Sequence, residues 1–296
     1  MRRPSRRCTR DSPSVSRTPS RPPRRLPRLA RRTVHAPSHI ETGRVPSLRR
    51  ELGVSRLPPF HWWRTVCFLI PAISVYTIAL GTLSIASSLV DRSGRFAHRC
   101  ARIWSWLILA TTGVDVRISG LERVDRQKTY VFAANHQSIY DIPILFSALP
   151  FEVRILAKDS LGRFPFLGWH LSRAGHVLVD RRNPGASVFR QVAQLMRAGV
   201  SLTVFPEGTR SVDGSLRLFK AGTFKMAIEH GLPVVPVAIH GSRFVMRKGN
   251  LMTCPGRVEL ELFDPIPTTD LSRDDARRLS GQVQQRIAAV VERTKG

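Results

Sequence analysis

The sequence predicts an α/β fold in which a mixed sheet is covered by helices, preceded by membrane-embedded helices. From about residue 116 onward, short runs rich in β-branched and aromatic residues alternate with amphipathic runs of helical period, which predicts the α/β part. An uncharged run from Thr65 to Val90 predicts the membrane part. We therefore divide the 296 residues into a basic segment (1–58), a membrane-associated helical segment (59–115) and an α/β domain (116–296).

The basic segment carries much of the chain's formal charge of +26. It holds 16 Arg, no Lys and only three acids, and it is rich in Pro and Ser but poor in large apolar residues. Such a segment buries too little surface to offset the entropy of ordering, so we expect it to be disordered. Its composition is also typical of an organellar transit peptide, and a downstream translation start is a third interpretation.

So large a positive charge implies an anionic partner, either nucleic acid, lipid head groups or an acidic substrate. No helix-turn-helix or aromatic-interleaved module accompanies the basic segment, so we expect it to attract anionic membrane lipid and no nucleic acid. A nucleic-acid-binding protein and a non-catalytic membrane scaffold are the alternatives from other functional classes.

The run from Thr65 to Val90 would reach about 39 Å as a helix at about 1.5 Å per residue, which is long enough to cross a bilayer. Pro71 and Gly81 interrupt it and predict a kink or a break. A second apolar stretch, Ile103 to Val114, is too short to span alone. Both flanks of the long run are basic, so a single transmembrane helix and a helical pair inserted into one leaflet both remain open. Four tryptophans would suit the interface: Trp62, Trp63, Trp104 and Trp106.

In the α/β domain, runs of strand-forming residues predict five strands, at 129–136, 176–180, 200–205, 233–239 and 258–263. Amphipathic periodicity predicts three helices, at 186–197, 219–229 and 274–293. Ser272 and Asp275 form a capping box at the start of the last helix. The alternation of strands and helices predicts a mixed or mostly parallel sheet.

The strongest chemical signal is the segment NHQSIYD, Asn135 to Asp141, which directly follows a predicted strand. Open α/β sheets usually place their sites at such strand ends. A histidine can take a proton from a hydroxyl, and a carboxylate can fix its tautomer and stabilise the imidazolium. Five residues on one helix would separate the two side chains by about 140°, so we expect His136 in the loop and Asp141 in the first turn of the next helix. Taken alone, the bare spacing is better explained by a polar loop that caps a helix, because the pattern is short.

Three further segments add to this signal. In FPEGTR, Phe205 to Arg210, the glycine permits close backbone approach and the guanidinium suits a phosphate. In the third segment, Lys158 precedes GRFPFLGW, where Phe164 and Phe166 could meet an acyl chain. The fourth, VPVAI, indicates a buried strand without chemistry. Taken alone, FPEGTR is also explained as a Pro-Gly turn, and GRFPFLGW is also explained as a helix–turn anchored by aromatic residues.

The chain resembles the glycerolipid acyltransferases, in particular the bacterial-type 1-acyl-sn-glycerol-3-phosphate acyltransferases. The resemblance rests on four segments that occur in the family's order: NHQSIYD, GRFPFLGW, FPEGTR and VPVAI. The resemblance runs from about Arg64 to Ile239 and implies a glycerol-3-phosphate acyltransferase-like α/β domain behind membrane-embedded helices. It implies acyl transfer from acyl-CoA or acyl-ACP to the sn-2 hydroxyl of 1-acyl-sn-glycerol 3-phosphate, giving phosphatidic acid. The implied roles are general base for His136, its partner for Asp141, phosphate binding for Lys158 and Arg210, and shaping of the acceptor pocket for Glu207, Gly208 and Thr209.

The resemblance also implies no covalent acyl-enzyme, so that Ser138 is dispensable, and neither metal nor prosthetic group. The scattered cysteines agree with this, since none has the spacing of metal ligands or of a disulfide framework. Backbone N–H groups near Gly162 to Gly168 are expected to stabilise the oxyanion. The implied location is the inner or cytoplasmic membrane, with the catalytic domain on the cytoplasmic side. Another acceptor, such as glycerol 3-phosphate, a lyso-ornithine lipid or another lysophospholipid, stays open.

Overall fold

The structure is a computed structural model that describes residues 59–91, 93–163, 167–180 and 186–293. The predicted disorder of residues 1–58 therefore lies outside the described residues, as do Phe164 and Phe166. All of the described residues belong to one compact unit.

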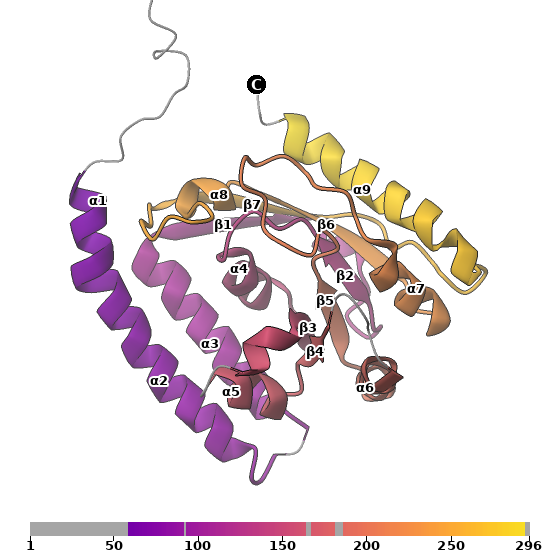
Figure 1. The fold of residues 1–296 in the computed structure, drawn as a ribbon, viewed down its shortest axis with the longest axis horizontal. Coiled ribbons are helices and arrows are strands. Elements are labelled where there is room, and N and C mark those ends of the chain that lie inside the picture. The colour runs from indigo at the N-terminus through magenta and orange to yellow at the C-terminus, as the bar shows by residue number, and fades with distance from the viewer. Residues whose placement is uncertain (1–58, 92, 164–166, 181–185, 294–296) are drawn as a thin grey trace, which may run out of the picture. The chain divides into compact units, whose positions relative to one another are not determined.

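A seven-stranded sheet in the order β1-β7-β6-β2-β5-β3-β4 forms the centre of this unit (Figure 1). Its strands are β1 (Val114–Ser119), β2 (Val131–Ala134), β3 (Val153–Lys158), β4 (Val177–Val179), β5 (Ser201–Val204), β6 (Val234–His240) and β7 (Gly256–Leu262). Neighbouring strands are parallel except for the antiparallel pair β6 and β7, so the sheet is mixed, as predicted. The central strand β2 pairs with β5 on one side and β6 on the other, and all four of its residues are buried.

All five predicted strands are present, with ends shifted by one to two residues. The sequence analysis missed β1 and β3. Strand β1 (VDVRIS) alternates apolar and polar residues, but it lies at an edge of the sheet and is mostly exposed, so it contains no continuous apolar run. Strand β3 contains Arg154, a charged residue that is nevertheless buried, because its guanidinium donates to Glu152 Oε1 (2.8 Å) and to the Ser93 carbonyl (3.1 Å).

Helices cover both faces of the sheet and bury two apolar clusters (Figure 1). On one face lie α3 (Arg95–Thr112) and α4 (Asp141–Ala148), and on the other lie α6 (Ala186–Arg197), α7 (Ala221–Glu229) and α9 (Ala276–Arg293). The predicted apolar stripe of α9 is confirmed, since Leu279, Val283 and Ile287 are fully buried. The predicted capping box, Ser272 with Asp275, is also present and precedes this helix as a single 3-10 turn. Shorter helices are α1 (Pro59–Trp63), α5 (Leu167–Arg173) and α8 (Ser242–Val245).

The long apolar run forms one continuous helix, Phe60–Ser87, so of the predicted kink or break at Pro71 and Gly81, the break is wrong. A π-helical turn, Arg64–Leu69, joins α1 to α2 (Ile70–Ser87), and Pro71 stands in the first turn of α2. Proline lacks a backbone N–H donor, and its ring crowds the carbonyl groups of the preceding turn. The wider π-helical turn accommodates the ring of Pro71. With 28 residues and a mean hydropathy of 2.0 in its most apolar stretch, the helix is long and apolar enough to cross a membrane, and only 6% of that stretch is buried.

Most of the second apolar stretch, Ile103 to Val114, forms the later part of α3, which begins at Arg95. Helices α2 and α3 pack together, and Trp104 Nε1 donates a hydrogen bond of 2.8 Å to Thr77 Oγ1. Trp104 is therefore turned towards α2, whereas Trp62, Trp63 and Trp106 are exposed as an interfacial position requires.

Candidate active site

His136 and Asp141 lie together at the carboxyl end of β2. His136 is in the loop after the strand and Asp141 is the first residue of α4, so the geometry inferred from their spacing is confirmed. Nδ1 of His136 is 2.8 Å from Oδ2 of Asp141, which is fully buried. A carboxylate has no proton to give, so Nδ1 donates and Nε2 keeps a lone pair that can accept a proton.

The same carboxylate oxygen also fixes the loop between the two residues. Asp141 Oδ2 accepts hydrogen bonds from the backbone N–H groups of Gln137 (2.7 Å) and Ser138 (2.9 Å). Phe205 then covers one face of the imidazole, with ring centroids 4.0 Å apart and planes 19° apart. The orientation of His136 is thus set by a charged partner at one edge and an aromatic ring on one face.

Glu207 connects the FPEGTR segment to this loop. Its buried carboxylate accepts the backbone N–H of His136 at Oε1 (2.6 Å) and that of Arg217 at Oε2 (3.0 Å). Burial raises the pKa of Glu207 to about 7, the two backbone hydrogen bonds oppose this, and the charge of Asp141 adds to it. A backbone bond from Ser211 N–H to the His136 carbonyl (2.8 Å) reinforces the same junction.

The VPVAI segment, to which the sequence analysis gave no chemistry, holds Asn135. The Asn135 amide donates to the Ile239 carbonyl (2.9 Å) and its oxygen accepts the Ile239 N–H (2.7 Å). On the other side, Ser138 Oγ donates to the Met246 carbonyl (2.8 Å) and is buried. The loop that carries His136 is therefore anchored at both ends by segments more than 100 residues away along the chain.

The predicted phosphate ligands come from neighbouring strands. Lys158 is the exposed last residue of β3, which pairs with β5, the strand that leads into FPEGTR. Thr209 is exposed and Arg210 partly buried. Lys248, a residue in no recognised motif, donates from Nζ to Thr209 Oγ1 (3.2 Å) and to the Arg210 carbonyl (3.0 Å). Among the described residues, no hydrogen bond or ion pair joins Lys158 to Arg210.

Gly208 turns the chain at this point, with φ of +73°. A Cβ atom there would lie 3.2 Å from Nζ of Lys220, a second cation that the sequence analysis missed. Only glycine adopts this backbone conformation without strain, and its missing side chain leaves room for the ammonium group.

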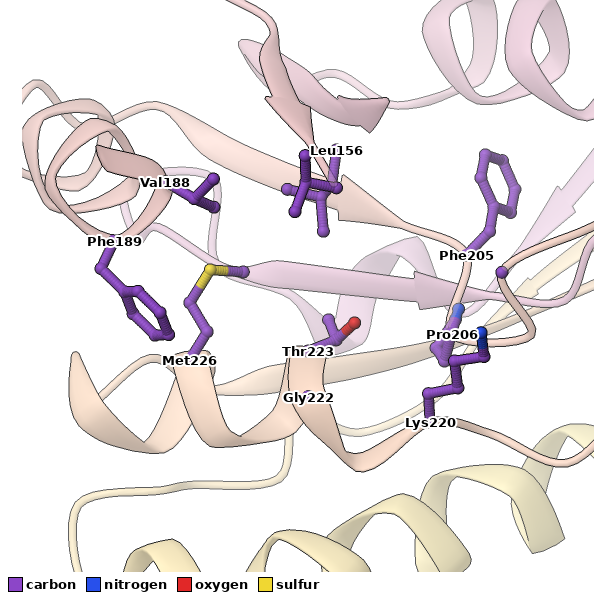
Figure 2. Close-up of a pocket in the computed structure, with 11 residues that line it drawn as sticks. Leu156, Val188, Phe189, Phe205, Pro206, Lys220, Gly222, Thr223 and Met226 are labelled. Atoms are coloured by element: carbon purple, nitrogen blue, oxygen red, sulfur yellow. The ribbon is translucent and has the colours of Figure 1, made fainter. Parts of the chain in front are cut away.

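A cavity of about 220 Å³ lies beside this turn (Figure 2). Its lining is mainly apolar, with Leu156, Val188, Phe189 and Met226 far from Lys220, which stands next to Pro206. Phe205 also lines the cavity, so the residue whose ring stacks on His136 borders it. The site thus combines a histidine bonded to a buried carboxylate, a set of cations and an apolar recess.

Within the part of the chain that the structure describes, no group of three or more His, Cys, Asp or Glu side chains is arranged to hold a metal ion. The three cysteines in that part, Cys67, Cys100 and Cys254, are free.

Residues 115–240 match the model of the acyltransferase family. A chloroplastic 1-acyl-sn-glycerol-3-phosphate acyltransferase of Brassica napus is 34% identical over 225 residues, 72% of this chain and 64% of the relative. One from Cocos nucifera is 30% identical over 184 residues, 61% of this chain and 58% of the relative. The chain thus spans about three-fifths of the length of these relatives.

Among solved structures, the 1-acyl-sn-glycerophosphate acyltransferase PlsC of Thermotoga maritima has the same fold, with a TM-score of 0.68 at 25% identity. The match covers 80% of this chain and 97% of that one. Because the family model matches the segment that holds His136, Asp141 and Glu207, and because the fold agrees with that of PlsC, residues 115–240 form an acyltransferase-family segment of this chain.

Proposed function

We propose that this chain transfers a fatty acyl group from acyl-CoA or acyl-ACP to the sn-2 hydroxyl of 1-acyl-sn-glycerol 3-phosphate, giving phosphatidic acid. The observation that carries this proposal is the hydrogen bond between His136 Nδ1 and Asp141 Oδ2 (2.8 Å), inside a segment of the acyltransferase family. The acceptor is taken from the names of the relatives from Brassica napus, Cocos nucifera and Thermotoga maritima.

In the proposed reaction, Nε2 of His136 removes the proton of the acceptor hydroxyl as its oxygen attacks the thioester carbonyl. Asp141 holds the productive tautomer and stabilises the imidazolium that forms. The tetrahedral oxyanion, stabilised by backbone N–H groups near Gly162 to Gly168, collapses as the C–S bond breaks. The proton on His136 then passes to the leaving thiolate. No covalent acyl-enzyme, metal or prosthetic group takes part, and the Ser138 hydroxyl stays bonded to the Met246 carbonyl.

The cations and the cavity supply substrate binding in this scheme. Arg210 and Lys158 bind the acceptor's phosphate, and Lys220 and Lys248 add positive charge beside the same turn. The apolar cavity next to Phe205 suits an acyl chain. The helix Phe60–Ser87, which is long and apolar enough to cross a membrane, supports a location at a membrane. In this proposal the catalytic domain lies on the cytoplasmic side.

The test is an assay of the purified full-length chain with a panel of acceptors: lysophosphatidic acid, glycerol 3-phosphate, a lyso-ornithine lipid and lysophosphatidylcholine, each with acyl-CoA and with acyl-ACP. We expect lysophosphatidic acid to be acylated, and His136→Ala to lose about 10²–10⁴-fold in rate. His230→Ala, at the end of α7, is the matched control and should keep the wild-type rate. Unchanged transfer by His136→Ala would overturn the role of this histidine, and acylation of a different lyso-lipid alone would overturn the acceptor.

A further inference from the structure

The segment Ser242–Cys254, which we name the α8 segment, contacts both loops of the candidate active site. The Met246 carbonyl accepts the hydrogen bond from Ser138, which lies in the loop that carries His136. Nζ of Lys248 donates to the carbonyl of Arg210 in the FPEGTR turn. The α8 segment therefore forms part of the border of the site.

The other end of the α8 segment contacts the apolar helix. The backbone N–H of Thr253 donates a hydrogen bond of 3.1 Å to Oγ1 of Thr65, in the π-helical turn. The preceding helical turn carries three exposed aromatic side chains, Phe60, Trp62 and Trp63. Exposed aromatic residues at the end of an apolar helix are typical of a membrane–water interface. The α8 segment is thus continuous with the part of the chain that has the strongest membrane character.

The outer face of the α8 segment presents large apolar side chains to solvent. Phe244 is 61% exposed and Leu251 is 68% exposed. Val212 is 63% exposed, and its carbonyl accepts a hydrogen bond of 3.4 Å from the Arg243 side chain of the α8 segment. One exposed apolar residue is ordinary on a protein surface, but several on neighbouring loops indicate a contact surface.

The charges of the segment indicate which partner covers this surface. The α8 segment contains three cations, Arg243, Arg247 and Lys248, and no acidic residue. Arg247 is exposed and lies between Phe244 and Leu251 in the sequence. Apolar side chains that alternate with cations fit the boundary between anionic head groups and acyl chains, where each kind of group finds its own environment.

We propose that the α8 segment is a second membrane-contacting element, which inserts Phe244 and Leu251 into the head-group region of an anionic bilayer. Because the same segment borders the site, this contact would place the His136 loop next to the lipid surface, so that a lipid acceptor need not leave the bilayer. The proposal concerns where the chain meets lipid and does not depend on the acceptor or on the reaction.

The depth of individual side chains in a bilayer tests this directly. In the full-length chain with its native cysteines replaced by serine, Phe244→Cys and Leu251→Cys would each carry a polarity-sensitive dye. The matched control is Ile118→Cys, a partly exposed apolar position on edge strand β1. Each protein would be placed in phosphatidylcholine vesicles with and without phosphatidylglycerol, and quenched by doxyl-labelled lipid or by aqueous iodide.

With phosphatidylglycerol, we expect a blue shift and quenching by doxyl lipid at positions 244 and 251, and quenching by iodide alone at 118. Arg247→Glu should reduce the lipid quenching in anionic vesicles and leave it unchanged in neutral ones. Hydrogen exchange of the unmodified chain gives an independent measurement, in which vesicles should slow exchange at residues 242–252 and leave β1 unchanged.

Iodide quenching at 244 and 251 equal to that at 118 would overturn the proposal, and so would unchanged exchange at 242–252. The proposal would also be overturned if positions 244 and 251 were protected from iodide, or residues 242–252 from hydrogen exchange, only after an acidic acyl carrier protein is added. The surface would then bind a protein and not a bilayer. Neither measurement uses acyl transfer, so failure here leaves the proposed reaction standing, and loss of the reaction leaves this surface standing.

Discussion

Replacement of Glu207 by Gln should change how the stability of the protein depends on pH. In the folded chain, the Glu207 carboxylate is buried and accepts two backbone N–H groups, from His136 and Arg217. Burial raises its pKa from 4.5 to about 7. Glutamine has a similar shape and carries no charge at any pH, so the substitution removes the titration and keeps the volume.

The magnitude follows from the pKa shift. A shift of about 2.5 pKa units corresponds to about 3 kcal/mol, at about 1.4 kcal/mol per unit. Between pH 4.5 and about 7 the folded state binds more protons than the unfolded state, so the free energy of unfolding falls as the pH rises. The contribution is fully present below pH 4.5 and is lost above about pH 7. In Glu207→Gln the unfolding free energy no longer falls with pH in this way. One backbone N–H group then faces the amide NH₂ of Gln and loses its acceptor, which lowers the unfolding free energy by about 1–3 kcal/mol at every pH.

Urea unfolding in mild detergent, followed by far-UV circular dichroism from about pH 4 to 8, measures both effects. We expect the difference in unfolding free energy between the wild type and Glu207→Gln to change by about 3 kcal/mol across this range. The control is Glu122→Gln, whose side chain is 75% exposed and which should parallel the wild type. A Glu207→Gln curve parallel to the wild type would refute the reasoning, because Glu207 would then titrate alike in both states.

Three further substitutions test the site. Asp141→Asn keeps an oxygen for the loop N–H groups but removes the charge beside His136, so kcat of acyl transfer should fall by about 10⁴-fold in a chain that circular dichroism shows to be folded. Gly208→Ala forces alanine to φ of +73° with its Cβ 3.2 Å from Nζ of Lys220. It should lose about 1–2 kcal/mol in urea unfolding, and an unchanged midpoint would contradict this. Ser138→Ala loses two hydrogen bonds of Oγ, one donated to the Met246 carbonyl and one accepted from the Tyr140 N–H, each worth about 1 kcal/mol, and it should keep its acyl transfer. A loss of activity as large as that of Asp141→Asn would point to a nucleophilic serine.

The part of the site that depends on local geometry could be predicted from the sequence. Helical periodicity disfavours a contact between His136 and Asp141 on one helix and favours a loop followed by a first turn, and the structure has that arrangement. The helix Ala186–Arg197 was predicted with its exact bounds for a similar reason, since Val188 and Val192 repeat at helical spacing and both are buried.

The parts that depend on backbone partners could not be predicted. Glu207 binds the N–H of His136, and Asn135 binds both backbone groups of Ile239. Every residue except proline offers such groups, so residue type carries no signal for the pairing. Strand β3 was missed for a related reason, because the partners that allow Arg154 to be buried include the Ser93 carbonyl, far away in sequence.

Helix α3 has a consequence for any attempt to obtain the catalytic part without its membrane part. One side of this helix packs against α2, and the other inserts Ile108 and Leu109 into the apolar cluster under the sheet. A truncation at the predicted boundary, residue 116, would remove α3 and the first residues of β1, and it would expose the side of α4 that α3 covers. Detergent would therefore have to solubilise the whole of residues 59–293, since the hydrophobic core that supports His136 extends into the lipid-associated helices.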